Sequence, residues 1–180
     1  MALGLLDGAD KKEAERLLVK AVEDYNYCVG TGFLSTPFLL PVLTEAGEVE
    51  VAYKMLENTK KPGWLGEVLD GATTIWENWE GNLSQNHYSP GAVCEWLFHT
   101  VGGIKVDGEN HFVIRPIPGG SLEYANTAYD SLYGKVETAW KKSEEGASYT
   151  ITIPSNTTAE IILPNGKKET VTAGTYEFQA

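Results

Sequence analysis

The 180-residue sequence is short of cysteine, histidine and positive charge. Its two cysteines, Cys28 and Cys94, form no CxxC pair, so neither a zinc site nor a disulfide framework is expected, and two reduced, buried thiols favour a cytoplasmic location. The three histidines lack HExxH or HxH spacing, so we expect no metal ion, and no motif indicates a cofactor. The chain has only 14 lysines and arginines but 25 aspartates and glutamates. The resulting formal net charge of −11 argues against nucleic acid or an anionic membrane as partner.

Long hydrophobic runs are also missing. No window of about 18 apolar residues occurs, so a transmembrane helix is not expected. The first residues, "MALGLLDGADKKEAERLL", have no basic segment, and their apolar run is too short for a signal peptide. Hydrophobic residues make up 42% of the chain and charged residues 22%, which is typical of a globular protein.

The spacing of apolar residues is helical up to about residue 105. Asp10 is the expected N-cap of a first helix, with Glu13 at the capping-box position. The predicted inner face of that helix has the i, i+3, i+4, i+7 spacing of Ala14, Leu17, Leu18, Ala21, Val22 and Tyr25. Four further short helices are predicted, from an N-cap at Thr36, after Gly47, after the Pro62-Gly63 break, and over residues 91–103.

After residue 105 the apolar period becomes two. Six or seven short strands are expected, at the spacing that indicates a sandwich. One hairpin should turn through a loop of about four residues, "SLYG", and another through Asn165-Gly166. The sequence therefore predicts an α+β protein with a helical domain at residues 1–105 and a small antiparallel β-sandwich at 106–180.

Between two helical segments lies a long connection, residues 71–88, without a helical pattern. Connections of this length are usually functional or disordered, and its tryptophans argue against disorder. Trp76 and Trp79 flank Glu77. Aromatic faces suit the C–H faces of sugar rings, and large rings beside a carboxylate can shift its pKa by desolvation. The alternative interpretation of Glu77 is a surface glutamate next to two core tryptophans.

Asn86 and His87 follow in the same connection. Either could exchange hydrogen bonds with a ligand hydroxyl, or could be hydrogen-bonded for structure alone. Glu80 and Glu95 are the other candidate carboxylates, and a solvated helix face explains Glu95 better than a catalytic role.

Three stretches, "TGFLSTPFLLPVLTEAGEVEVAYKML", "GATTIWENW" and "NHYSPGAVCEWLF", resemble the C-terminal part of bacterial α-L-rhamnosidases, glycoside hydrolase family 78. The downstream "FVIRPIPGGSLEYANTAYDSLYGKVETAWK" is similar to the strands that follow their catalytic domain. The resemblance implies the end of an (α/α)6 toroid followed by a β-sandwich. It also implies an inverting mechanism with Glu77 as general base, His87 as a rhamnose contact, and Trp76 and Trp79 lining the cleft. Many relatives carry arginine where this chain has Asn78.

The family takes its general acid from a segment upstream of these motifs, and no such segment is present here. The resemblance therefore implies a fragment of an inverting enzyme that releases terminal α-L-rhamnose, inactive alone. Its expected partners are rhamnose-containing glycosides and further copies of itself, bound through exposed helical surface. A carbohydrate-binding domain without catalysis and a structural or interaction domain are the alternatives.

Overall fold

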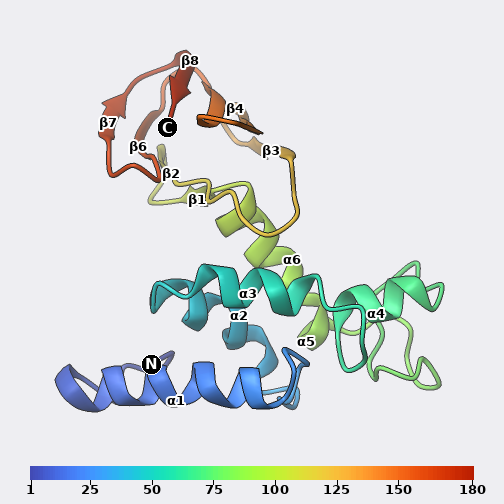
Figure 1. Ribbon diagram of the computed structural model, residues 1–180. Coiled ribbons are helices and arrows are strands. Elements are labelled where there is room, and N and C mark those ends of the chain that lie inside the picture. The colour runs from blue at the N-terminus through green and yellow to red at the C-terminus, as the bar shows by residue number, and fades with distance from the viewer. The chain divides into compact units, whose positions relative to one another are not determined.

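The computed structural model describes residues 1–180, which form two compact units, Met1–Cys94 and Glu95–Ala180. The helices are α1 (Gly8–Asp24), α2 (Thr36–Glu45), α3 (Val49–Leu56), α4 (Trp64–Leu69), α5 (Tyr88–Gly91) and α6 (Val93–Trp96), the last spanning the division between the units (Figure 1). None of these helices is long and apolar enough to cross a membrane.

The core of the helical unit lies between α2 and α3. Helix α2 is apolar on nearly all sides, and Leu40 and Leu43 are at most 2% exposed. On α3, the residues Ala52, Tyr53 and Met55 are fully buried as well. Burying such side chains stabilises the unit by roughly 1.5–3 kcal/mol for each large one.

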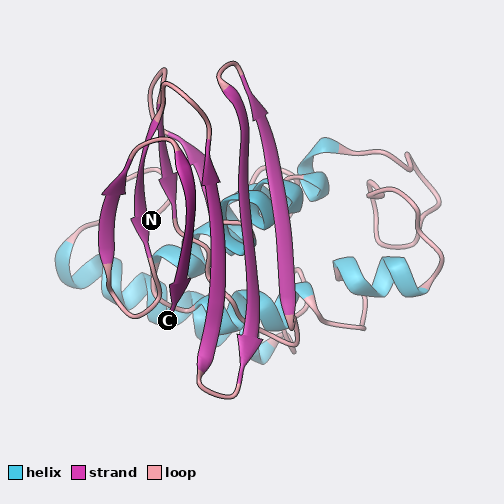
Figure 2. Cartoon of the chain, turned by 90° about the horizontal axis from the view of Figure 1, so that it is seen from above, coloured by secondary structure: helices cyan, strands magenta, loops and turns pink.

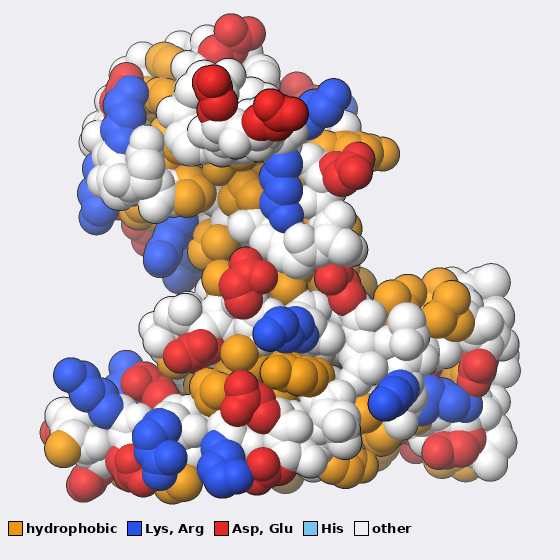
Figure 3. Space-filling model, viewed as in Figure 1, with side chains coloured by type: hydrophobic (Ala, Val, Ile, Leu, Met, Phe, Trp, Pro, Cys, Tyr) orange, Lys and Arg blue, Asp and Glu red, His pale blue; other side chains and the backbone are white.

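Helix α1 differs from its prediction at its start and on its inner face. It begins at Gly8 behind an extended N-cap, Asp7, so Asp10 lies in the first turn and forms no capping box. Of the predicted inner face only Val22 is buried, and Leu17 is 50% exposed. The reason is that this face has few neighbours to pack against. Charged side chains follow α1 over the surface visible in Figure 3.

Two other helix predictions need correction. Ser35 occupies the N-cap position of α2 without a side-chain capping bond, so Thr36 is the first residue of the helix rather than its N-cap. The single helix predicted over residues 91–103 is divided into α5, α6 and a π-helix, η1 (Leu97–Val101). Pro90 and Gly91, both poor helix formers, lie at the first division. Trp96, on α6, is buried.

The second unit contains two four-stranded sheets (Figure 2). In order across the sheets, the first comprises β1 (Ile104–Val106), β2 (His111–Ile114), β6 (Thr158–Ile162) and β7 (Lys168–Val171), and the second β3 (Tyr124–Ser131), β4 (Gly134–Ser143), β5 (Gly146–Ile153) and β8 (Gly174–Gln179). All strand pairs are antiparallel except β2 and β6, which are parallel. The predicted α+β fold is confirmed, with eight strands rather than six or seven.

The β-unit buries alternate residues, as the period of two predicts. On β5, Tyr149, Ile151 and Ile153 are at most 2% exposed. The hairpin at Asn165-Gly166 is confirmed, with Gly166 at φ +85°. The β3–β4 hairpin is tighter than predicted, because Ser131 pairs directly with Gly134.

The two cysteines are both free thiols. Cys28 is buried, as predicted, but Cys94 is exposed, because its position on α6 faces away from the side that buries Trp96.

Candidate functional site

The connection at residues 71–88 begins with a defined helix end. Gly71 adopts φ +94° beyond the last residue of α4, and its N–H donates to the Val68 carbonyl at 3.0 Å. The next N–H, of Ala72, donates to the Glu67 carbonyl, also at 3.0 Å. These paired bonds form a Schellman motif, which satisfies the last helix carbonyls and sets the direction of the chain.

Two arms of this connection are held against each other by backbone hydrogen bonds. The His87 N–H donates to the Ile75 carbonyl at 3.0 Å, and the Glu77 N–H donates to the Ser84 carbonyl at 2.8 Å. The Thr74 hydroxyl adds a bond to the Gln85 carbonyl. Glu77 and His87 therefore lie on facing arms of one ordered loop, which we call the Glu77–His87 loop (residues 71–88).

The Glu77 side chain is half-buried. Its Oε2 accepts a hydrogen bond from the Ser84 N–H at 3.3 Å, while Oε1 accepts none from the protein. Nearby, the Asn78 amide donates to Asn82 Oδ1 at 2.6 Å. The carboxylate is thus oriented by one backbone group and keeps one oxygen for a ligand or water.

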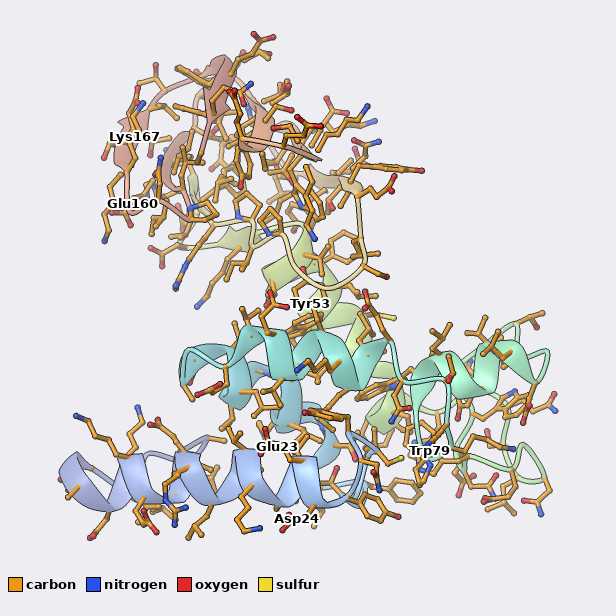
Figure 4. The ribbon with its side chains drawn as sticks, in the orientation of Figure 1. Glu23, Asp24, Tyr53, Trp79, Glu160 and Lys167 are labelled. Carbon is orange, nitrogen blue, oxygen red and sulfur yellow. The ribbon has the colours of Figure 1, made fainter.

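The two tryptophans of the loop are half-buried and packed. The Trp76 ring lies so close to Gly81 that a Cβ there would be 2.6 Å from it. Trp79, labelled in Figure 4, packs edge-on against the Trp64 ring with centroids 5.9 Å apart. Trp64 is itself fixed by an Nε1–H bond to the Pro90 carbonyl at 2.9 Å. Both loop tryptophans therefore keep only part of their surface open.

His87 is held more tightly than the other candidates. Its Nδ1 accepts the Ser89 N–H at 3.2 Å, so Nδ1 carries no proton and the ring is the neutral Nε2–H tautomer. The ring stacks on Phe33 on one side, with centroids 4.5 Å apart, and on Tyr88 at 5.0 Å. Ser89 also donates its hydroxyl to the Phe33 carbonyl at 2.6 Å. The Nε2–H has no partner in the protein and remains a free donor.

The remaining candidates are more exposed. The Asn86 backbone exchanges bonds with the Ser84 hydroxyl, and its exposed side-chain amide binds no protein group. Glu80 is exposed, and Glu95 is an exposed residue 3.5 Å from the His99 ring. Among these carboxylates, only Glu77 is partly enclosed.

Sequence reasoning missed four residues of this site. Phe33 and Tyr88 stack on the His87 ring, Gly81 accommodates Trp76, and Glu67 is buried on α4, which precedes the loop. Glu67 is the buried acid of an otherwise apolar "WLGEVL" helix, and that contrast is the one signal that could have drawn attention to it.

The chain matches two family models. Residues 1–101 match the bacterial alpha-L-rhamnosidase 6 hairpin glycosidase domain, and residues 105–177 match the bacterial alpha-L-rhamnosidase C-terminal domain. The chain belongs to the bacterial α-L-rhamnosidase family. The family resemblance of the sequence motifs is thereby confirmed.

Curated α-L-rhamnosidases align along nearly the whole chain. The one from Streptomyces avermitilis is 37% identical over 98% of this chain, and one from Formosa agariphila is 34% identical over 99%. The chain spans 18% and 21% of their respective lengths, about a fifth.

Solved α-L-rhamnosidases have the same fold in the matching region. The enzyme from Aspergillus terreus superposes with a TM-score of 0.91 and 32% identity, covering 97% of this chain and 22% of its own. The Streptomyces avermitilis enzyme, solved in complex with L-rhamnose, also gives 0.91, with 33% identity over 98% of this chain and 20% of its own.

Proposed function

We propose that this chain supplies one wall of an α-L-rhamnosidase active site and its general base, Glu77, for hydrolysis with inversion. Family membership supports the reaction class, and the half-buried Glu77 carboxylate in an ordered loop supports the residue. We infer that the general acid comes from outside these 180 residues, so that the chain alone does not turn over substrate.

In an inverting hydrolysis the base takes a proton from water as the water oxygen bonds to the anomeric carbon. The bond from that carbon to the departing oxygen breaks, and the general acid protonates the departing oxygen. The two carboxyl groups are typically about 6.5–9.5 Å apart, which leaves room for the water. Glu77 suits the base because Oε2 is oriented by the Ser84 N–H while Oε1 is free to receive the water proton.

His87 is the proposed contact to a rhamnose hydroxyl. Its neutral ring presents Nε2–H as a donor, and stacking between Phe33 and Tyr88 keeps the ring from rotating. Fixed donors raise the rate because positioning is completed before the reaction begins. Trp76 and Trp79 would cover apolar sugar faces with the part of each ring that remains open.

We also propose that the chain alone self-associates through its helical unit. A groove of about 650 Å³ lies beside the N-terminus and is lined mainly by apolar side chains. Two of them, Leu5 and Leu34, are 81% and 85% exposed. Exposed apolar surface of this kind usually marks a contact with another surface.

A chimera tests the catalytic proposal. Residues 1–180 would replace the matching segment of the Streptomyces avermitilis α-L-rhamnosidase, and kcat would be measured on an aryl α-L-rhamnoside. We expect Glu77→Gln to lower kcat by roughly 10²–10⁴-fold, the usual contribution of a general base. The matched control, Glu80→Gln, removes an exposed carboxylate three residues away and should leave kcat within about twofold. Equal kcat for the two variants would refute the assignment of Glu77.

A further inference from the structure

Ser89 is a buried polar residue whose side chain the proposed chemistry does not use. It lies on α5 and is 0% exposed, so its hydroxyl has no access to water. The hydroxyl donates instead to the main-chain carbonyl of Phe33 at 2.6 Å, across 56 positions of the sequence. A buried hydroxyl usually finds such a partner, because leaving it unpaired costs about 1–3 kcal/mol. The bond therefore joins α5 to the segment that precedes α2.

The Phe33 carbonyl needs this outside donor because α2 cannot supply one. In an α-helix the donor to a carbonyl is the N–H of the residue four positions later. Four positions after Phe33 stands Pro37, which has no N–H. The Thr36 N–H, one position nearer, is bound to the Gly32 carbonyl at 3.0 Å. The proline thus leaves a carbonyl at the start of α2 that the Ser89 hydroxyl binds.

Both donors of Ser89 act on the same pair of rings. Its N–H donates to Nδ1 of His87 at 3.2 Å, and its hydroxyl donates to the carbonyl of Phe33. The rings of these two partners stack with centroids 4.5 Å apart and an angle of 30° between their planes. Phe33 is nevertheless 46% exposed, so packing restrains its ring on only part of its surface. The position of the Phe33 ring on the imidazole therefore depends on where its backbone is held.

The short helix that carries Ser89 is itself held in place. Trp64, which is 4% exposed, donates its Nε1–H to the Pro90 carbonyl at 2.9 Å. The Gly91 N–H donates to the His87 carbonyl at 3.1 Å and closes the helical turn. The Ser89 hydroxyl is thus presented from a backbone that is bonded on both sides of it.

We propose that Ser89 is a positioning residue for His87. Its hydroxyl holds the Phe33 carbonyl, which keeps the Phe33 ring stacked on the imidazole and so fixes the direction of the Nε2–H. Loss of the hydroxyl would loosen the stack but keep the tautomer, because the Ser89 N–H remains. Small displacements of a binding group are costly in catalysis, since positioning must be complete before the reaction begins. This inference rests on the proposed role of His87 as the rhamnose contact.

NMR of the His87 ring in the 180-residue chain tests the proposal. The protons of an imidazole stacked on a phenyl ring are shifted upfield by the ring current, and Phe33→Leu gives their unstacked positions. We expect Ser89→Ala to remove at least half of this upfield shift, while the ring nitrogens keep the signals of the Nε2–H tautomer. The control, Ser35→Ala, removes an exposed hydroxyl that makes no capping bond and lies two residues from Phe33, and it should match the parent.

Two further variants separate positioning from a general effect on folding. Ser89→Ala added to Phe33→Leu should move the His87 signals no further, because the hydroxyl acts through the Phe33 ring. If Ser89→Ala does not fold, Ser89→Cys, whose thiol is a weaker donor, should give an intermediate shift.

Four results would each overturn the proposal. They are parent His87 signals equal to those of Phe33→Leu, an unchanged upfield shift in Ser89→Ala or Ser89→Cys, an equal loss in Ser35→Ala, and a change of tautomer in Ser89→Ala. No sugar is present in these measurements. Their outcome is therefore independent of whether His87→Ala changes KM in the chimera, which tests the rhamnose contact itself.

Discussion

The contact between Gly81 and the Trp76 ring gives the sharpest prediction about the shape of the site. Gly81 has φ +71°, and a Cβ there would lie 2.6, 2.7 and 2.9 Å from three atoms of the Trp76 ring. Gly81→Ala should therefore carry two costs. The left-handed backbone costs about 1–2 kcal/mol for a residue with a Cβ. The contact with the ring adds about 1–3 kcal/mol of overpacking.

A matched control separates these two costs. Gly71 lies in the same loop at φ +94°, and a Cβ there would meet nothing within 4 Å. Gly71→Ala should therefore show the backbone cost alone. The difference between the two variants measures the contact with Trp76.

Hydrogen exchange of the Glu77 and His87 amides is the assay, because both amides join the two arms of the loop. An extra cost of about 1–3 kcal/mol corresponds to exchange about five- to 150-fold faster in Gly81→Ala than in Gly71→Ala. Backbone amides of β5 serve as the internal reference for global unfolding. Equal exchange in the two variants would show that the Trp76 ring does not lie against Gly81.

Other predictions concern the ligand contact, assembly, packing and pH. In the chimera, His87→Ala should raise KM for an aryl α-L-rhamnoside by roughly fivefold or more, as expected for loss of one hydrogen bond, and an unchanged KM would contradict the proposed contact. Light scattering should find the chain larger than a monomer, and Leu34→Asp should shift it toward the monomer, whereas a monomeric parent would refute self-association. Trp64→Phe should lower the free energy of unfolding by about 1–3 kcal/mol in urea titrations, because it leaves the buried Pro90 carbonyl without its donor. Because burial raises the pKa of Glu67 in the folded state, stability should fall as pH rises from the ordinary carboxyl pKa to the raised one, and a pH series of urea titrations should show this fall disappear in Glu67→Gln.

Local pattern was sufficient to predict much of the fold. The change of apolar period near residue 105 separated helices from strands, and Asn165-Gly166 located one hairpin. Helix α1 shows where the pattern fails. Its apolar spacing is regular, yet only Val22 is buried, because periodicity identifies an apolar face without identifying what covers it.

Only part of the candidate site could be predicted from the sequence, because several of its features depend on contacts between residues that are distant in the chain. Its location was visible because tryptophans and a glutamate are unusual in a long connection. The tautomer of His87 depends on a bond to the Ser89 N–H, and its orientation on a stack with Phe33, which is distant in sequence. Glu67 lies on α4 and is only 1% exposed, which depends on the packing of the whole helical unit. The features of His87 have no local sequence signal, and Glu67 is distinguished only by its place in the otherwise apolar "WLGEVL" helix.

The central claim is that the Glu77 carboxylate activates the nucleophile in an inverting reaction. Rescue of a Glu77 variant by azide is its most direct test. In the chimera with Glu77→Gly, the small anion would occupy the space of the carboxylate and its water and needs no general base. The account predicts that azide restores turnover of an aryl α-L-rhamnoside and that the product is β-L-rhamnosyl azide, formed by attack on the face opposite the departing group. Unrestored turnover, or an azide product of α configuration, would contradict it.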